Sequence, residues 1–449
     1  MSSNENNSVM TGKLLACSAI LIIGSGAVHA CSADDGLTSD LGTGGHSSTS
    51  TSTSGGGSGA GTGNGGMGAG FDPDPEPEPC ENHPGEILCI DGEAITCGAG
   101  GEEVNTQDCG DEVCVPGVGC VLCIDGQYSC DGNSVLACNP GPPLQWDTIG
   151  HCDPLSLERC NRITGTCEPL TVIGDVTPTG FYYQYARFQS GSTDFLGGYD
   201  VDSLGDYLYV NRQGSYLDVY KVELLDSDGD GEFEPNQHPD NPDATGPIED
   251  RVITHIETFT TTMGQASRAE VYAVPEGVFF VNYQAPKADI FKFTFNGQAT
   301  TTAVTTTTQL NLAHLGYDMV NGTWYGANEG GRRVYSFHAP SQEWVAEFAY
   351  PDLAGSHMDG IEVVTDPNDG TPYVYVSDMT SDYLGQYLRE RGDTWVQVNL
   401  FEYAGTGEYV EGMGFGALNH FWAAAGSAVY EIGGGDLAKF TEPDDPPPR

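Results

Sequence analysis

The chain has 449 residues and a formal net charge of −48 at pH 7, because 64 acidic residues face only 16 basic ones. Such a surface repels nucleic-acid phosphates and anionic lipid headgroups, which argues against a nucleic-acid partner and against membrane attachment through basic residues. The length leaves room for two or three domains.

The N-terminal segment predicts export. Residues 14–24 form an apolar run followed by small residues. The run is too short for a membrane-spanning helix, which needs about 20 apolar residues, so we expect residues 1–30 to be a signal peptide. The sequence offers two start sites: Met10 precedes a conventional basic segment with Lys13, whereas Met1 does not.

The signal segment ends at Val28-His29-Ala30-Cys31, which resembles the lipobox of bacterial lipoproteins. The resemblance implies that cleavage leaves Cys31 as a diacylated N-terminal residue. Ser32 after it is similar to the residue that directs lipoproteins of Gram-negative bacteria to the outer membrane. His29 and Val28 depart from the usual lipobox residues. We expect an exported protein, lipid-anchored at the outer membrane or cell surface, with a plain secreted protein as the alternative.

Residues 31–79 are expected to form a low-complexity tether. Ser, Thr and Gly dominate the segment 47–70, and this composition buries too little apolar surface to fold. The alternation of acid and proline over 72–79 is typical of a stiff, extended spacer. The tail 441–449 is expected to be disordered as well.

Twelve of the 14 cysteines lie between residues 80 and 167, and none follows. Such clustering in an exported chain predicts disulfides, whose pairing the sequence leaves open. The cysteine spacings repeat in two halves, which predicts a tandem duplication into two modules, 80–121 and 122–168. The first half holds Cys80, Cys89, Cys97, Cys109, Cys114 and Cys120, and the second holds Cys123, Cys130, Cys138, Cys152, Cys160 and Cys167.

The pair Cys120 and Cys123 has the one spacing that would suit zinc. This pair spans the joint between the two halves and would lie in an oxidising compartment, so disulfides are the preferred interpretation. Modules of this size have too little core to fold unaided, and each disulfide would stabilise them by about 2–4 kcal/mol.

Residues 169–440 contain no cysteine and predict an all-β domain. An aromatic-rich strand followed by an alternating strand recurs five times along this segment. Repeats of a few antiparallel strands are typical of a β-propeller, so the expected fold is all-β with a propeller of five or six blades. The stretch 181–188 either supplies a sixth blade or closes the ring. A β-sandwich is the alternative.

The strand rhythm resembles that of propellers of the NHL and gluconolactonase kind. This resemblance implies a divalent ion held by carboxylates at the channel, where it would polarise a carbonyl or activate water. Acidic residues that precede the first strand of each repeat would hold it: Asp200, Glu270, Asp318, Asp359 with Glu362, and Glu411. Asn211, Asn282 and Asn328 fall in register as well. Repeated acids also cap turns, which leaves a structural role as the alternative.

The segment 226–234 resembles the Asp-x-Asp-x-Asp-Gly calcium loop of EF-hand-like and thrombospondin-type repeats. Carboxylates at alternate positions of a tight turn can converge on one calcium ion. The predicted ligands are Asp226, Asp228, Asp230, Glu232 and Glu234, with Phe233 as an apolar anchor. The twelfth loop position is Gln237, so we expect Asp240 or Asp243 to supply the missing carboxylate. The ion would be structural; a merely solvated acidic loop is the alternative.

Together these features predict a cell-surface or outer-membrane lipoprotein whose propeller binds an extracellular protein, glycan or surface polymer. The alternative is a divalent-metal-dependent lactone or ester hydrolase with its acidic site at the channel. No Gly-x-Ser-x-Gly motif marks a serine hydrolase of that type. The strand aromatics Trp324, Tyr325 and Trp422 either stack on sugars or fill the core.

Overall fold

The computed structural model describes residues 79–434, except for residues 111, 140, 142–143, 190–197, 213–215, 243, 245, 262–269, 283–285, 329–330, 354–357, 379–380, 391–393 and 404–409. The expected signal peptide, the lipidated Cys31, the tether up to residue 78 and the tail 441–449 therefore lie outside the described residues. Among the helices within the described ranges, none is both long and apolar enough to cross a membrane.

The first cysteine-rich module consists of short strands held by disulfides. Strands β1, β2 and β3 form an antiparallel sheet, and β4 pairs with β5. The strands are β1 (Ile87–Ile90), β2 (Glu93–Cys97), β3 (Glu103–Asp108), β4 (Val113–Val115) and β5 (Gly119–Val121). The disulfides are Cys80–Cys97, Cys89–Cys114 and Cys109–Cys120.

The second module repeats this plan. Strands β6, β7 and β8 form a sheet, and β9 pairs with β10. The elements are β6 (Tyr128–Asp131), β7 (Ser134–Asn139), β8 (Gln145–His151), the 3-10 helix η1 (Pro154–Ser156), β9 (Glu158–Asn161) and β10 (Thr166–Pro169). The disulfides are Cys123–Cys138, Cys130–Cys160 and Cys152–Cys167.

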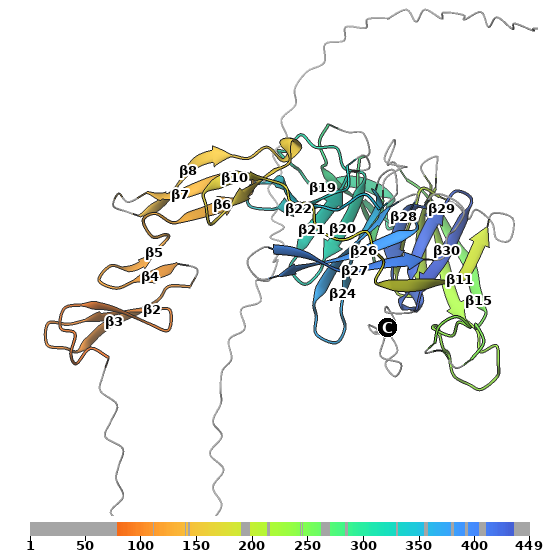
Figure 1. Ribbon diagram of the computed structural model, residues 1–449, viewed down its shortest axis with the longest axis horizontal. Coiled ribbons are helices and arrows are strands. Elements are labelled where there is room, and N and C mark those ends of the chain that lie inside the picture. The colour runs from red at the N-terminus through yellow and green to blue at the C-terminus, as the bar shows by residue number, and fades with distance from the viewer. Residues whose placement is uncertain are drawn as a thin grey trace, which may run out of the picture. The chain divides into compact units, whose positions relative to one another are not determined.

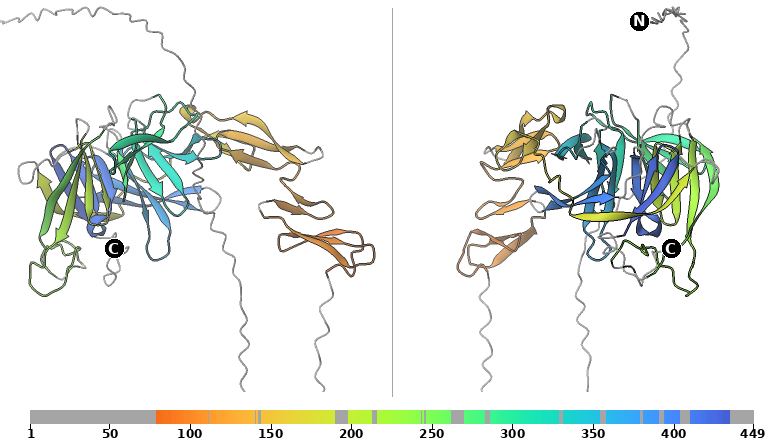
Figure 2. Two further views of the ribbon diagram at one scale, coloured as in Figure 1. Left: turned by 180° about the vertical axis from the view of Figure 1, so that it is seen from behind. Right: turned by 45° about the vertical axis from the view of Figure 1, so that its right-hand side comes forward.

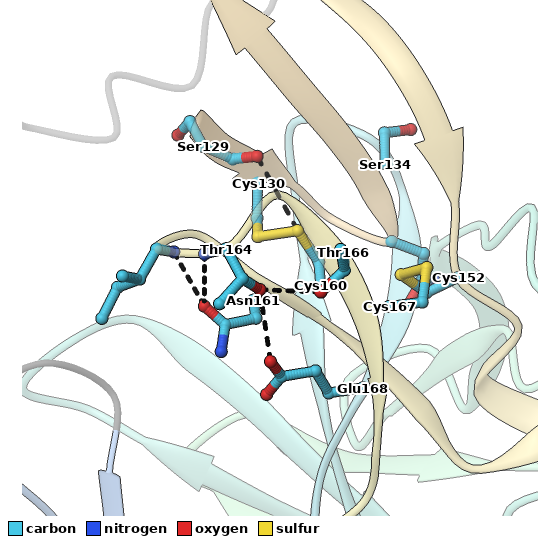
Figure 3. Close-up of a disulfide and its surroundings, with 12 residues drawn as sticks. Ser129, Cys130, Ser134, Cys152, Cys160, Asn161, Thr164, Thr166, Cys167 and Glu168 are labelled. Carbon is cyan, nitrogen blue, oxygen red and sulfur yellow. Dashed lines mark hydrogen bonds between the residues drawn. A yellow bond between two sulfur atoms is a disulfide. The ribbon is translucent and has the colours of Figure 1, made fainter. Parts of the chain in front are cut away.

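Both modules share one pairing pattern: the first cysteine bonds the third, the second bonds the fifth, and the fourth bonds the sixth. The predicted disulfides are thus confirmed, and the common pattern fits a duplication. Cys120 and Cys123 belong to different bridges instead of forming a zinc pair. Figure 3 shows the Cys130–Cys160 bridge, beside which the Asn161 side chain accepts hydrogen bonds from the following turn.

The remaining strands form a five-bladed β-propeller (Figure 1). Three blades are separate four-stranded antiparallel sheets, and the other two share a short parallel pairing. The first two blades are β12 (Asp200–Leu204), β13 (Tyr207–Arg212), β14 (Tyr216–Leu224) and β15 (Arg251–Thr260), then β16 (Val271–Val274), β17 (Gly277–Val281), β18 (Ile290–Thr294) and β19 (Ala299–Val304).

Blades three and four follow the same four-strand order. They are β20 (His314–Asp318), β21 (Thr323–Ala327), β22 (Arg333–His338) and β23 (Glu343–Ala349), then β24 (Met358–Thr365), β25 (Pro372–Asp378), β26 (Tyr383–Glu390) and β27 (Thr394–Tyr403). Blade five comprises β28 (Val410–Phe415), the 3-10 helix η3 (Ala417–Asn419), β29 (Phe421–Ala425), β30 (Ala428–Gly433) and an outer strand from the other end of the domain, β11 (Gly180–Gln189).

The first strand of each blade lies innermost. Strands β12, β16, β20, β24 and β28 contact one another in this order, and β28 returns to β12. The ring is closed by β11, which pairs antiparallel with β30 and so completes blade five (Figure 2). The stretch 181–188 therefore closes the ring and does not supply a sixth blade, and the sandwich alternative is excluded.

Apolar residues alternate between the two faces of a blade because successive side chains of a strand point to opposite sides. On β13, Leu208 and Val210 pack with blade five, whereas Tyr209 packs with blade two. On β25, Val374 packs with blade three and Tyr375 with blade five. Each interface between neighbouring blades thus has its own hydrophobic core, which explains why these strands are apolar on both faces.

Two glycines of β28 allow β12 to approach closely. A Cβ at Gly412 would lie 2.0 Å from Asp200 Oδ1, and a Cβ at Gly414 would lie 2.5 Å from the Cα of Asp202. Only a residue without a side chain fits at either position. The innermost strands can therefore converge tightly enough to bring acidic side chains together at the axis.

Candidate functional site

Two of the predicted channel acids, Asp200 and Glu270, lie together in the propeller. Asp200 begins β12, and its Oδ2 accepts a hydrogen bond of 2.6 Å from the backbone N–H of Val271 in the next blade. Glu270 precedes β16 and accepts hydrogen bonds from the N–H groups of Leu315, at 3.0 Å, and Ile361, at 3.1 Å. The carboxylates thus bond the innermost strands of other blades.

Two further acids join this cluster. Asp202 accepts a hydrogen bond from the N–H of Ala273, again in the next blade, and Glu362 lies close enough to interact with it. Glu362 was predicted beside Asp359, whereas Asp202 was not predicted. Asp202 follows Asp200 by two residues and therefore points to the same face of its strand, a pattern that could have revealed it.

These four carboxyl groups are buried, and their pKa values are raised. Burial away from water is the main cause, since it penalises the charged form. It raises the pKa of Asp202 to about 7 and those of Asp200, Glu270 and Glu362 well above the usual range. Repulsion between the neighbouring carboxylates acts in the same direction for Asp200, Glu270 and Glu362. Each of these carboxyl groups therefore binds its proton more tightly than a solvent-exposed carboxyl group does.

Asp318, another predicted channel acid, has a local structural role. Asp318 lies at the end of β20, where its carboxylate caps a turn by accepting hydrogen bonds from the N–H groups of Val320 and Asn321. Glu411 lies half-buried on β28. The side chain of Asp359 is outside the described residues.

Some buried side-chain oxygens of the propeller have no protein partner. They include the Oδ1 of Asp200, which is fully buried, and the side-chain oxygens of Asn282 after β17 and Asn328 after β21. Asn211 pairs across from Asp200 at the end of β13. A buried oxygen of this kind can accept a hydrogen bond from water or a ligand, or contact a cation.

The acidic loop forms a second candidate site. It begins an insertion that leaves β14 at Leu225 and returns to β15 at Asp250 (Figure 1). Its tight turns are fixed by carboxylates that accept backbone N–H groups: Asp226 bonds Gly229 and Gly231, at 2.6 and 3.0 Å. Gly229 and Gly231 both have positive φ, which favours glycine there.

The loop supplies the groups of carboxylates that, within the described residues, come near enough to share a metal ion. In each of two triads, one ligand atom per residue lies within 4.8 Å of the other two. The triads are Asp226, Asp228 and Glu249, and Asp228, Asp230 and Glu234. Four of the five predicted ligands belong to one or both of these triads, which share Asp228. Glu249, which no sequence motif marks, completes the first triad.

Four details of the predicted loop are corrected or left open. Phe233 is 62% exposed and does not anchor the loop. The side chain of Asp240 is 80% exposed and lies 4.0 Å from His238 rather than beside the triads. Asp243 lies outside the described residues. Glu232 donates its backbone N–H to Asp230, and its side chain is exposed.

A groove of about 730 Å³ lies between the second cysteine-rich module and the propeller. The module is fixed there by Asn133, whose N–H bonds Glu343 and whose side chain bonds the carbonyl of Trp344. The Cys130–Cys160 bridge lines one wall (Figure 3).

The groove is rich in arginine. Its charged lining residues are Arg159, Arg162 and Arg389 with Glu168 and Glu347. The lining thus contains more arginines than glutamates, whereas the whole chain has four acidic residues for each basic one.

Glu347 is buried and held in place. Its carboxylate accepts hydrogen bonds from Ser336 Oγ, at 2.6 Å, and Trp395 Nε1, at 2.9 Å. Arg159 and Arg389 flank it, at 4.0 and 3.8 Å, and both arginines remain partly exposed. One buried carboxylate therefore lies beside two arginines of the groove wall.

The aromatic side chains considered for sugar stacking mainly pack inside the propeller. Trp422 and Tyr325 are buried. Trp324 is half-buried and packs against Tyr317, with ring centroids 4.4 Å apart, and against Phe279.

Neither a protein-family model nor a curated protein matches the chain. Solved structures with a similar fold include the glutaminyl cyclase of Myxococcus xanthus, at 9% identity and a TM-score of 0.34, covering 59% of this chain and 97% of the cyclase. Virginiamycin B lyase from Staphylococcus aureus matches at 10% identity and a TM-score of 0.31, covering 55% of this chain and 98% of the lyase.

The WD40 β-propeller domain of Doa1 matches at 10% identity and a TM-score of 0.30, covering 56% of this chain and 97% of that domain. At these values the neighbours carry no argument about function.

The raised pKa values predict that stability decreases with pH. The folded state keeps protons on the channel carboxyls that the unfolded state releases, so the stabilisation present near pH 4 is lost as the pH rises towards 7. In the Asp202→Asn variant the free energy of unfolding should fall less steeply with rising pH, by up to about 1.4 kcal/mol per pH unit. Urea unfolding at pH 4, 5.5 and 7 measures it.

The exposed Asp206, in the same hairpin, provides the matched control. Asp206→Asn should leave the pH slope unchanged. Equal slopes for Asp202→Asn and the unchanged protein would contradict a role for the buried carboxyl.

Proposed function

We propose that this chain is an exported, lipid-anchored binding protein, and that the arginine-lined groove binds a carboxylate-bearing surface polymer, most simply an acidic polysaccharide. The observation that carries the proposal is the concentration of three arginines in one groove of an otherwise strongly acidic chain. Guanidinium groups form two parallel hydrogen bonds with a carboxylate, which gives both affinity and orientation.

The position of the groove supports this function. Ligand sites occur preferentially at the junction of two domains, and this groove lies where a disulfide-bonded module meets a propeller blade. A second hollow of about 320 Å³ continues from it along β27, past Ile173 and Trp395. An extended polymer could therefore follow the surface beyond the arginines.

Two parts of the proposal concern the setting of the propeller. The lipid on Cys31 and the tether place the folded part away from the outer membrane. Calcium in the acidic loop is structural and orders the insertion of blade one. The convergence of four predicted ligands in that loop supports calcium.

The binding proposal predicts that Arg162→Gln weakens binding of polygalacturonate about tenfold or more, since a hydrogen bond to a charged group contributes about 1.5–3 kcal/mol. Calorimetry at about 0.15 M salt measures this binding. At this ionic strength the Debye length is about 8 Å, so salt screens the repulsion between the polymer and the net charge of the protein more than it screens the contacts inside the groove. Arg162 is exposed, so its replacement leaves the fold intact.

The matched control is Arg332→Gln, which changes an arginine paired with Asp352 outside the groove. This variant should bind as the unchanged protein does. Neutral dextran should not bind either form. Equal losses for both arginine variants would contradict the groove as the site.

The anchor predicts a lipid-modified N-terminus in the mature protein. Mass spectrometry of protein extracted from membranes should find Cys31 as the first residue, carrying acyl chains. A Cys31→Ser variant should be released into the medium. An unmodified cysteine at this position would overturn the anchoring and leave a plain secreted protein.

A metal-dependent lactone or ester hydrolase is the second candidate. It is favoured by one observation, the buried Asp200 Oδ1 without a protein partner in the channel. Opposing it, the channel carboxylates already accept backbone N–H groups of neighbouring blades.

Metal stoichiometry separates these two functions. A binding protein with one structural site should bind one calcium ion per chain and none after Asp226→Asn with Asp228→Asn. A hydrolase with a channel ion should retain one divalent ion in that double variant and lose it on Asp200→Asn. Calorimetry with calcium and zinc salts, followed by a lactone and ester screen, measures this.

A further inference from the structure

The starting point is the carboxylate of Glu249, which is 2% exposed. One of its oxygens accepts a hydrogen bond of 2.6 Å from the backbone N–H of Glu234. The other oxygen, Oε1, is buried and has no protein partner. A buried carboxylate oxygen without a partner is costly unless a positive charge compensates it.

The acidic loop lies directly beside this carboxylate. Ligand atoms of Glu249, Asp226 and Asp228 lie within 4.8 Å of one another. Oxygens bound to one calcium ion at about 2.3–2.6 Å fall within this separation of each other. Glu249 also fixes Glu234 through its N–H, and Glu234 belongs to the second triad.

We propose that Glu249 is the carboxylate that completes the calcium site of residues 226–234, and that the bound ion thereby secures the strand pairing that closes the propeller ring. The proposal rests on the structural calcium of the proposed function and adds to it a ligand and a consequence. Glu249 takes the place that the sequence suggested for Asp240 or Asp243.

The link to the ring begins two residues after Glu249. Arg251, at the start of β15, is buried and donates to the carbonyls of Glu249 and Pro235, both in the insertion. Its Nε also lies 2.9 Å from the carboxylate of Glu431 on β30. One guanidinium therefore joins the middle and the C-terminal end of the insertion to blade five.

A second set of contacts joins the insertion to the same blade. His420 bonds Glu431 through Nδ1, at 2.6 Å, and Asn236 through Nε2, at 2.8 Å. Tyr185 on β11 donates its hydroxyl to the carbonyl of Asn236, at 3.1 Å. The ring of Tyr183, also on β11, stacks on His238 with centroids 4.7 Å apart.

The insertion thus contacts β11 directly and is joined to β30 through Arg251 and His420, and the pairing of β11 with β30 closes the ring. We refer to this pairing as the closing seam. Without the ion, the mutual repulsion of the loop carboxylates opposes the compact insertion, and the contacts of Asn236, His238 and Arg251 lose their support. With the ion bound, the same contacts are held against the closing seam.

The first measurement is calcium binding by the full mature chain, measured by calorimetry. Glu249→Gln should weaken binding tenfold or more, because a charged ligand is replaced by a neutral one of the same shape. Asp240→Asn, which removes an exposed carboxylate outside the triads, should leave the affinity unchanged.

The second measurement is hydrogen–deuterium exchange with calcium and with a chelator. Calcium should slow amide exchange in β11 and β30 of the unchanged protein and leave β20 and β21 in blade three unaffected. Glu249→Gln should lose this protection. Asp228→Asn alters an exposed ligand and leaves the buried contacts intact, and it should lose the protection as well. This second variant therefore separates loss of the ion from a folding defect caused by Glu249→Gln.

The outcomes separate the two levels of the proposal. Absence of calcium binding to the unchanged protein would overturn the structural calcium itself. Full binding by Glu249→Gln would leave that calcium in place and overturn the role of Glu249. Weakened binding with unchanged exchange in β11 and β30 would overturn the coupling to the closing seam.

Discussion

The fold depends on one strand pairing, that of β11 with β30. A propeller built from consecutive blades has two free ends, and the interface between its first and last blades forms only if the ring closes. Here the strand that precedes blade one becomes the outer strand of blade five, so the two ends of the domain are hydrogen-bonded together. The five interfacial cores, one between each pair of blades, can then all form at once.

Closure also forces acidic side chains into the channel. Gly412 and Gly414 allow β28 to approach β12 so closely that Asp200 and Asp202 are buried against it. Their carboxyl groups compensate by accepting backbone N–H groups of the next blade, which ties the innermost strands together. The pKa values of both carboxyl groups are raised, so we expect the stability of the ring to decrease as the pH rises.

Charge is distributed unevenly over the described residues. Acidic residues are abundant throughout, yet Arg159, Arg162 and Arg389 gather in one groove and Arg251 occupies a buried position at the closing seam. Arginine is scarce in this chain, and the groove and the closing seam are two of the places where it occurs. The two proposals for this protein follow from these two positions.

Local patterns determined much of this structure. The two-residue alternation of apolar side chains predicted an all-β repeat, the cysteine spacing predicted two disulfide modules, and the loop 226–234 predicted converging carboxylates. These signals are readable because each depends on residues close together in the chain. The ring-closing role of 181–188 was left open, because an outer strand and a sixth blade have the same periodicity.

Only the tertiary structure decided which distant residues meet. Glu249 joins Asp226 after a long insertion, Arg159 and Arg389 come from different domains, and the pairing of the cysteines required the three-dimensional arrangement of their strands. The acidic ring was only partly predicted. The carboxylate of Asp318 accepts hydrogen bonds from the turn that follows it, whereas that of Asp200 bonds the next blade. Sequence shows which groups a strand or loop presents; burial and long-range packing determine which of them converge.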